Sequence, residues 1–330
     1  MALLELKDLH TFFRTKKGIV KAVNGVSYSV EAGRTLGVVG ESGSGKSVSA
    51  MSILQLLDGN GYIDSGEILF EGRDLTKLTE KEMYSVRGND ISVIFQEPMT
   101  SLNPVFTVSR QVSEPFIIHQ GMTKKQAAAK VIEMLVDVKI PNPHIVAKQY
   151  PHQLSGGMRQ RVMIAMALAC KPKLLIADEP TTALDVTIQA QILKLMNDLK
   201  EEHGTSIIFI THDLGVIRQI ADDVAVMYCG QVVEMAPAGT IFMDAEFSHP
   251  YTEGLMNSIP RLSTPTHTRL DAIPGAVPHP LKLPKGCKFA PRCKYATERC
   301  LNEEPEMIHV SETQQVRCFY PRKEDRHGKK

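Results

Sequence analysis

The chain has 330 residues, of which 43% are hydrophobic and 23% charged, as in globular proteins with one large core and room for a smaller domain. Its 38 lysines and arginines nearly balance 37 acidic residues, so bulk charge gives no indication of nucleic-acid binding. The charged first ten residues do not resemble a secretory signal, and the longest apolar run, residues 162–170, is shorter than the ~20 residues of a membrane helix. We therefore expect a cytoplasmic location, where cysteines stay reduced.

Apolar runs alternate with helical patterns along the chain, which predicts an α/β fold with parallel strands covered by helices. Residues 3–13 and 21–33 alternate with period two and predict antiparallel strands at the start of the chain. The parallel strands are expected at 35–40, 91–95, 173–178 and 206–212. Helices are expected at 124–138, with Ala128, Val131, Ile132, Leu135 and Val138 on one face, and at 187–203, capped by Gly204.

The stretch GESGSGKS follows a predicted strand and precedes a predicted helix, which is the arrangement of a phosphate-binding P-loop. Its glycines let backbone N–H groups approach phosphate oxygens, and the helix N-terminus adds partial positive charge. Lys46 would neutralise the β- and γ-phosphates, and the Ser47 hydroxyl would ligate Mg²⁺. A glycine-rich turn that matches by chance is the alternative. The candidate nucleotide-binding residues are Gly40, Glu41, Ser42, Gly43, Ser44, Gly45, Lys46 and Ser47.

Two adjacent carboxylates, Asp178 and Glu179, end the apolar strand KLLIAD. Carboxylates at the end of a buried strand are costly unless they hold something charged. Asp178 suits the Mg²⁺ shell, and Glu179 suits a general base that activates the attacking water. A solvated turn is the alternative, but together with the P-loop these residues predict an NTPase.

Four further stretches carry a family resemblance. LSGGMRQR at 154–161 resembles the signature of ATP-binding cassette (ABC) proteins and lies between the P-loop and the carboxylates, as in that family. IFQEP with Gln96 is similar to the Q-loop, TALD with Asp185 to the D-loop, and ITHDL with His212 to the switch histidine. The resemblance implies a P-loop cassette with a RecA-like parallel core, an antiparallel N-terminal subdomain and a helical signature subdomain.

The resemblance also implies roles for these residues. Ser155, Gly156 and Gly157 would close over an ATP held by the P-loop of a second cassette in a head-to-tail dimer, and Asp185 would reach across it. Gln96 would sense Mg²⁺ and the attacking water, and His212 would contact the γ-phosphate. Adenine would stack on an aromatic side chain from the N-terminal sheet, for which we favour Phe13. Catalysis would thus involve Glu179, His212, Gln96 and Lys46, with Ser47, Gln96 and Asp178 at Mg²⁺.

Longer stretches such as FQEPMTSLNP and HPYTEGL look like the ATPase subunits of oligopeptide and dipeptide permeases. This resemblance implies a peripheral protein at the cytoplasmic face of the membrane, bound to two permease subunits through a groove around residues 96–120. It would pair with a second, related ATPase or with its own copy, and an extracytoplasmic binding protein would deliver the peptide. The alternatives are importers of nickel or another non-peptide solute and a soluble ABC ATPase acting on nucleic acid or ribosomes, although no nucleic-acid partner is expected.

After about residue 258 the chain becomes rich in proline, so we expect a cassette at 1–257, with its helical subdomain at about 97–160, and an extension at 258–330. Four of the six cysteines lie in the extension with C-x5-C-x6-C-x17-C spacing: Cys287, Cys293, Cys300 and Cys318. Thiolates suit either Zn²⁺ or an iron–sulfur cluster, and unliganded thiols are a third possibility. The tight C-x2-4-C hooks of structural zinc sites are missing, and resemblance to peptide-permease ATPases implies a [4Fe-4S] cluster.

Overall fold

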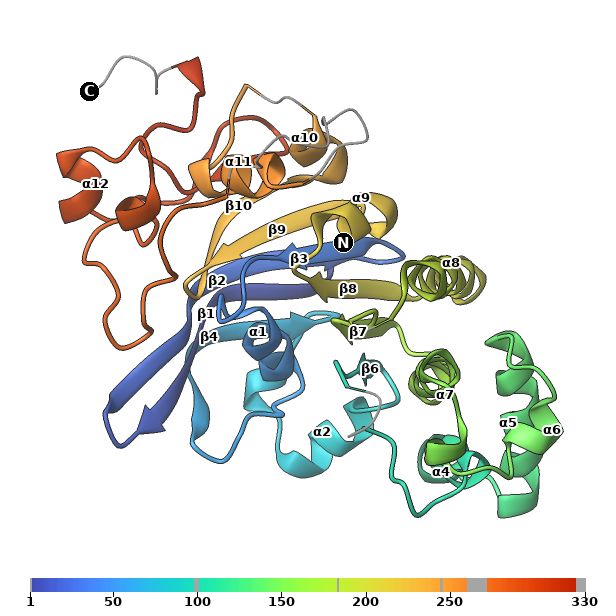
Figure 1. Cartoon of the computed structure of the whole chain (residues 1–330). Helices are drawn as coiled ribbons and strands as arrows, with labels where there is room; N and C mark the ends of the chain where they lie inside the picture. The colour runs from blue at the N-terminus through green and yellow to red at the C-terminus, as the bar shows by residue number, and fades with distance from the viewer. Residues whose placement is uncertain (1, 98–100, 183, 244–245, 260–271, 325–330) are drawn as a thin grey trace. The chain divides into compact units, whose positions relative to one another are not determined.

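The computed structural model of the chain describes residues 2–97, 101–182, 184–243, 246–259 and 272–324 (Figure 1). These residues form two compact units, which we describe separately. The signature unit contains residues 31–34 and 77–210, and the phosphate-loop unit contains residues 2–30, 35–76 and the described part of 211–330.

The signature unit is built on three buried parallel strands. Strand β7 (Leu174–Asp178) pairs in parallel with β6 (Ile91–Ile94) and with β8 (Ser206–Thr211). Both faces of these strands are apolar, as expected for parallel strands covered by helices. The helices of this unit are α2 (Glu80–Val86), α4 (Val108–Gln120), α5 (Lys124–Asp137), α6 (Pro143–Val146), α7 (Gly156–Leu168) and α8 (Val186–His203). Helices α4, α5 and α7 pack against one another, in green in Figure 1.

The phosphate-loop unit contains an antiparallel sheet of order β2-β1-β4-β5. Its strands are β1 (Ala2–Thr15), β2 (Gly18–Glu31), β4 (Gly61–Phe70) and β5 (Arg73–Asp74). This sheet confirms the period-two prediction for the start of the chain.

A second set of strands in this unit positions the P-loop. Strand β3 (Thr35–Val39) pairs in parallel with β9 (Asp223–Tyr228), which forms an antiparallel hairpin with β10 (Gln231–Pro237). The extension contributes β12 (Gln315–Val316), which pairs with β10, and β11 (Ile308–His309), which pairs with β12. The helices are α1 (Lys46–Ile53), α9 (Leu214–Ile220), α10 (Ala238–Phe242), α11 (Pro250–Asn257) and α12 (Glu298–Asn302).

All four expected parallel strands form, and α8 ends at Gly204, whose φ of 67° fits a left-handed C-cap. The predicted face of α5 is partly wrong. Ala128 is exposed, whereas Ala127 and Met134 are buried with Val131 and Leu135. The helix has apolar residues on both sides of its buried face, so its sequence is compatible with either Ala127 or Ala128 in the core. Packing of α5 against α4 and α7 buries Ala127.

Within the described residues, no helix combines the length and the apolar character that crossing a lipid bilayer requires. Residues 98–100, which belong to the predicted permease groove, and residues 260–271, which follow the predicted domain boundary, lie outside the described residues.

Candidate nucleotide and cysteine sites

The predicted P-loop connects β3 to α1. Gly40 has φ of 155° and Gly45 has φ of 97°, backbone conformations that favour glycine. A Cβ atom at Gly40 would lie 2.2 Å from the carbonyl oxygen of Met227, and one at Gly45 would lie 2.4 Å from that of Ala22. Side chains are therefore excluded at both positions, and the loop can wrap closely around an anion at the start of α1.

Lys46 is buried at the base of this loop. Its ammonium donates hydrogen bonds to the carbonyl oxygens of Gly40 at 2.8 Å and Glu41 at 3.1 Å. Ser47 follows in the first turn of α1, whereas Ser42 and Gly43 are exposed at the tip of the loop. The positively charged Lys46 side chain thus lies against the same loop whose N–H groups can bind phosphate.

The signature unit brings Gln96 and Glu179 together, as their predicted roles require. The side-chain amide of Gln96 donates to the Glu179 carboxylate at 3.1 Å, and the Thr182 hydroxyl donates to the same oxygen at 3.0 Å. Asp178 is the last residue of β7 and is 7% exposed. The hydrogen bonds from Gln96 and Thr182 can orient the Glu179 carboxylate so that it accepts a proton from a nearby water.

Glu179 has an unusual backbone conformation. Its φ of 46° lies in the left-handed region, which costs a non-glycine residue about 1–2 kcal/mol. The Glu179 N–H donates to the carbonyl oxygen of Ile210 at 2.9 Å and helps to hold this conformation. Strained backbone of this kind is typical of functional sites, where surrounding structure offsets the strain.

The signature serine begins α7. The Ser155 hydroxyl accepts a hydrogen bond from the Met158 N–H at 3.3 Å, so Ser155 is the N-cap of this helix. Ser155 and Gly156 are exposed, which leaves the helix N-terminus accessible to an anion. Asp185 plays the same capping role for α8 by accepting from the Ile188 N–H at 2.9 Å. Its reach across a dimer stays a prediction.

His212 directly follows β8 and is exposed. The next residue, Asp213, caps α9 by accepting from the N–H groups of Gly215 and Val216. The chain therefore turns sharply after His212 and leaves this residue directly after the end of β8, and its contact with a γ-phosphate stays a prediction.

Neighbouring phenylalanines on β1 have different environments. Phe12 is 8% exposed, and its ring lies edge-on to Tyr62, with centroids 6.2 Å apart. Phe13 is half-buried and faces Gly61, where an added Cβ would come within 2.7 Å of the Phe13 ring. The Phe12 ring therefore belongs to the core, whereas the Phe13 ring stays available for a ligand.

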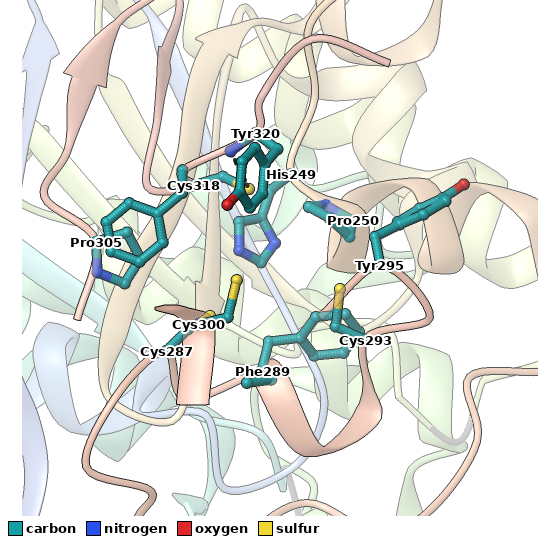
Figure 2. A pocket seen from close by; sticks show the side chains of 12 residues that line it. His249, Pro250, Cys287, Phe289, Cys293, Tyr295, Cys300, Pro305, Cys318 and Tyr320 are labelled. Carbon is teal, nitrogen blue, oxygen red and sulfur yellow. Dashed lines mark hydrogen bonds between the residues drawn. The ribbon is translucent and has the colours of Figure 1, made fainter. Parts of the chain in front are cut away.

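The four cysteines of the extension line one pocket of the phosphate-loop unit: Cys287, Cys293, Cys300 and Cys318. Figure 2 shows their side chains around this pocket together with the imidazole of His249. The rest of the lining is mostly apolar, with Pro250, Phe289 and Pro305 among its members. Burial raises the pKa of the Cys287 thiol, which therefore stays protonated at neutral pH unless a bound metal displaces the proton.

Among the residues that the structure describes, no three histidine, cysteine, aspartate or glutamate side chains are arranged so that they could hold a metal ion. Within these described residues the structure thus gives no positive indication of a zinc site or of an iron–sulfur cluster. All six cysteines are free thiols, and Cys229 is buried in the β9–β10 turn while Cys170 is half-buried against the carbonyl oxygen of Pro115.

Sequence reasoning missed three residues at or between the cysteine pocket and the P-loop. Arg292 forms an ion pair with Glu41, the Tyr251 hydroxyl accepts from the Glu41 N–H, and His249 lines the cysteine pocket. The pairs are separated by 251 and 210 positions in the chain, so no local spacing could reveal them. Only weak signals exist in the sequence: a tyrosine in HPYTEGL, and an arginine directly before Cys293, as there also is before Cys300 and Cys318.

Comparisons with known proteins agree with these sites. The family described as "ABC transporter" matches residues 23–182, and the family described as "Oligopeptide/dipeptide transporter, C-terminal region" matches residues 233–300. The oligopeptide transport ATP-binding protein AppD of Bacillus subtilis is 52% identical over 96% of this chain and 96% of its own length. OppD of Salmonella typhimurium, also described as an oligopeptide transport ATP-binding protein, is 51% identical over 97% of this chain and 94% of its own.

A solved structure with a similar fold is that of MJ0796, an ATP-binding cassette described as dimeric, in a post-hydrolysis state and bound to ADP and Pi. It has a TM-score of 0.64 and 29% identity, and the match covers 71% of this chain and 98% of MJ0796.

The phosphate loop, the carboxylates after β7 and the signature at α7 define a P-loop ATPase of the ATP-binding cassette class. Relatives with about 50% sequence identity match nearly the full length of this chain, and its C-terminal region matches a family of oligopeptide and dipeptide transporters. The chain therefore belongs to the family of oligopeptide-transport ATP-binding proteins.

Proposed function

We propose that this chain hydrolyses ATP to power the import of oligopeptides or dipeptides through a membrane permease. The observation that carries this proposal is the match of residues 233–300 to the C-terminal region of oligopeptide and dipeptide transporters, in addition to the cassette itself. The relatives named above are described as oligopeptide transport proteins, so a soluble ATPase that acts on nucleic acid or ribosomes is not favoured.

The proposed chemistry needs positioning and charge neutralisation more than covalent catalysis. Lys46 and the P-loop N–H groups bind phosphate, Ser47 and Asp178 would hold Mg²⁺, and Glu179 takes a proton from the attacking water. Gln96 keeps the Glu179 carboxylate oriented through the 3.1 Å hydrogen bond, and Gln96 also belongs to the proposed Mg²⁺ shell. His212 contacts the γ-phosphate.

We propose that two cassettes bind ATP between them, head to tail. The exposed N-cap of α7, with Ser155 and Gly156, supplies the second anion-binding surface that such a dimer requires. The second cassette is either a related ATPase or a copy of this chain. MJ0796, with a similar fold, is described as dimeric.

Phe13 is proposed to stack on adenine. Phe13→Ala should weaken ATP binding by about tenfold, because stacking of one base on an aromatic ring contributes ~1–3 kcal/mol. Its matched control is Phe12→Ala, which should instead lower the free energy of unfolding by about 3–5 kcal/mol because Phe12 is buried. Titration with a fluorescent ATP analogue and thermal unfolding separate the two effects. Unchanged ATP affinity in Phe13→Ala would remove this residue from the site.

A groove in the signature unit is the proposed docking surface for a permease subunit. It lies along α4 and the start of α5 and is lined by Phe106, Arg110, Ile117 and Ile118, among others. The Arg110 guanidinium stacks on the Phe106 ring at 3.5 Å, while Ile118 is 45% exposed. Exposed apolar side chains in a polar-rimmed groove fit an inserted helix of a membrane protein.

Ile118→Asp should reduce assembly with the solubilised permease by about tenfold while ATP binding stays unchanged, because it puts a charge into an apolar contact. Val136→Asp is the control, since Val136 is 55% exposed on α5 but does not line the groove. Co-purification of tagged permease measures assembly. Equal assembly of both variants would contradict docking at this groove.

We propose that the cysteine pocket holds a [4Fe-4S] cluster. Four thiols around one mostly apolar pocket are the donor set of such a cluster, in which each cysteine binds a different iron and the sulfurs need not meet at one ion. When bound, the cluster would cross-link separate turns of the extension. Its proposed role is structural or in docking, because phosphate chemistry requires no electron.

The transport proposal is tested by reconstituting the chain with its permease, partner ATPase and extracytoplasmic binding protein. Uptake is measured for a panel of peptides, nickel and oligosaccharides. Peptide uptake that depends on ATP supports the proposal. Uptake of only nickel or a sugar would assign the chain to another solute, and binding to ribosomes or DNA instead of permease would favour the soluble class.

A further inference from the structure

Two short segments run from the wall of the cysteine pocket to Glu41 of the P-loop. In the first, Phe289 lines the pocket and Arg292 binds the Glu41 side chain. In the second, His249 lines the pocket and Tyr251 binds the Glu41 backbone. All these residues belong to the phosphate-loop unit. Arg292 of the extension and Tyr251 of α11 therefore both contact the residue that follows the first glycine of the P-loop.

The Arg292 contact is a bidentate ion pair between a buried arginine and a partly exposed glutamate. The Arg292 side chain is 4% exposed, and its two terminal nitrogens donate to the two Glu41 carboxylate oxygens at 2.6 Å and 3.0 Å. Its Nε donates to the carbonyl oxygen of Pro274 at 3.0 Å, which fixes the direction of the guanidinium. Two parallel hydrogen bonds between a guanidinium and a carboxylate fix the orientation of the two groups as well as the distance between them.

The Tyr251 contact restrains the Glu41 backbone. The Tyr251 hydroxyl accepts from the Glu41 N–H at 2.8 Å. The Tyr251 ring is fully buried, with its centroid 4.7 Å from that of Tyr228 and 5.4 Å from that of Phe289. Phe289 thus packs against the ring whose hydroxyl holds the loop, and a change in the shape of the pocket wall would reach Glu41.

Glu41 in turn contacts the phosphate-binding lysine, because its carbonyl oxygen accepts from Lys46 at 3.1 Å. Glu41 is therefore held at its side chain by Arg292, at its N–H by Tyr251 and at its carbonyl by Lys46. Residues fixed in this way set the path of the loop before a ligand binds, and preorganisation raises affinity by lowering the cost of ordering.

We infer that Arg292 and Tyr251 are positioning residues for the P-loop, through which the cysteine-containing extension sets the affinity for nucleotide. The alternative is that the ion pair only attaches the extension to the rest of the unit. The two differ in one respect: an attachment contributes to stability alone, whereas a positioning contact also changes the nucleotide dissociation constant.

The test measures binding of a fluorescent ATP analogue to the full chain, together with the midpoint of thermal unfolding. Arg292→Gln should weaken nucleotide binding by about tenfold, and Arg292→Lys, which keeps the charge, should recover part of the loss. Tyr251→Phe retains the buried ring and should weaken binding by about threefold, because it removes one hydrogen bond. The milder Tyr251→Phe keeps the test informative if Arg292→Gln does not fold.

Lys288→Gln is the matched control. Lys288 is a buried cation in the same extension, next to Cys287 as Arg292 is next to Cys293, but it pairs with Glu304 at 2.7 Å. This variant should retain full nucleotide affinity. The double variant Glu41→Gln/Arg292→Gln should bind no more weakly than the weaker of the two single variants.

Three results would overturn the inference: unchanged nucleotide affinity in Arg292→Gln and Tyr251→Phe, an equal loss in Lys288→Gln, or additive losses in the double variant. Iron content, measured on each variant, shows whether any loss of affinity follows loss of the cofactor instead of loss of the ion pair. None of these measurements depends on the transported solute, so a failure of the transport proposal would leave them interpretable.

Discussion

The Glu179→Gln variant is expected to bind ATP but to hydrolyse it at least ~100-fold more slowly than the parent chain, because removing a general base typically costs 10²–10⁴-fold. Glutamine has nearly the same shape as glutamate and can accept the hydrogen bonds from Gln96 and Thr182 through its amide oxygen. The change therefore removes the basic carboxylate and leaves its surroundings in place. Single-turnover hydrolysis and nucleotide binding measure the two effects.

The same variant should accumulate the ATP-bound closed dimer, which size-exclusion chromatography with ATP and Mg²⁺ would detect. Glu201→Gln is a suitable control, since Glu201 lies exposed near the end of α8. This control should hydrolyse ATP at the normal rate. Normal turnover by Glu179→Gln would exclude Glu179 as the base and would direct attention to His212.

The second large effect concerns the cysteine pocket. Cys293→Ser is expected to lose nearly all iron and acid-labile sulfide after anaerobic purification, because serine is a poor substitute for a thiolate ligand. The four cysteines line one pocket, so each of them should matter in the same way. Iron and sulfide assays and the visible absorption of the proposed cluster measure the effect.

Cys170→Ser is the matched control, because Cys170 contacts Pro115 in the signature unit and lies outside the pocket. It should retain full iron and sulfide. Parent protein that contains neither element, or a Cys293→Ser variant that retains both, would exclude the cluster. A Cys293→Ser variant that lacks iron yet assembles normally with the permease would exclude only the docking role.

Much of the fold could be predicted from the sequence because its strongest elements are locally encoded. The four parallel strands are apolar runs bounded by polar residues, and the P-loop needs glycine where the backbone has positive φ. Strands β11 and β12 have only two residues each, too short for any periodicity, and no pattern predicted them. The wrong prediction for Ala128 on α5 shows that periodicity alone does not decide which residues are buried when a helix has apolar residues beside its buried face.

The candidate site likewise contains features that local motifs encode and contacts that they do not encode. Gln96 and Glu179 were both predicted to act near the attacking water, and the hydrogen bond between them is a finding of the structure. The contacts of Glu41 with Arg292 and Tyr251 were not expected, because both join residues more than 200 positions apart, and Arg292 also lies in a proline-rich segment without helical or strand periodicity. Only the three-dimensional path of α11 and of the extension brings these residues to the P-loop.

The pairing of β12 with β10 has a further consequence for the protein as a whole. Strand β10 has β9 on one side and β12 on the other, and the buried Glu234 on β10 accepts from the Gln314 side chain at 2.9 Å. A shorter chain ending near residue 257 would expose the backbone groups of β10 as an open sheet edge, and open edges promote aggregation. The last quarter of the chain thus protects the sheet from association with other molecules.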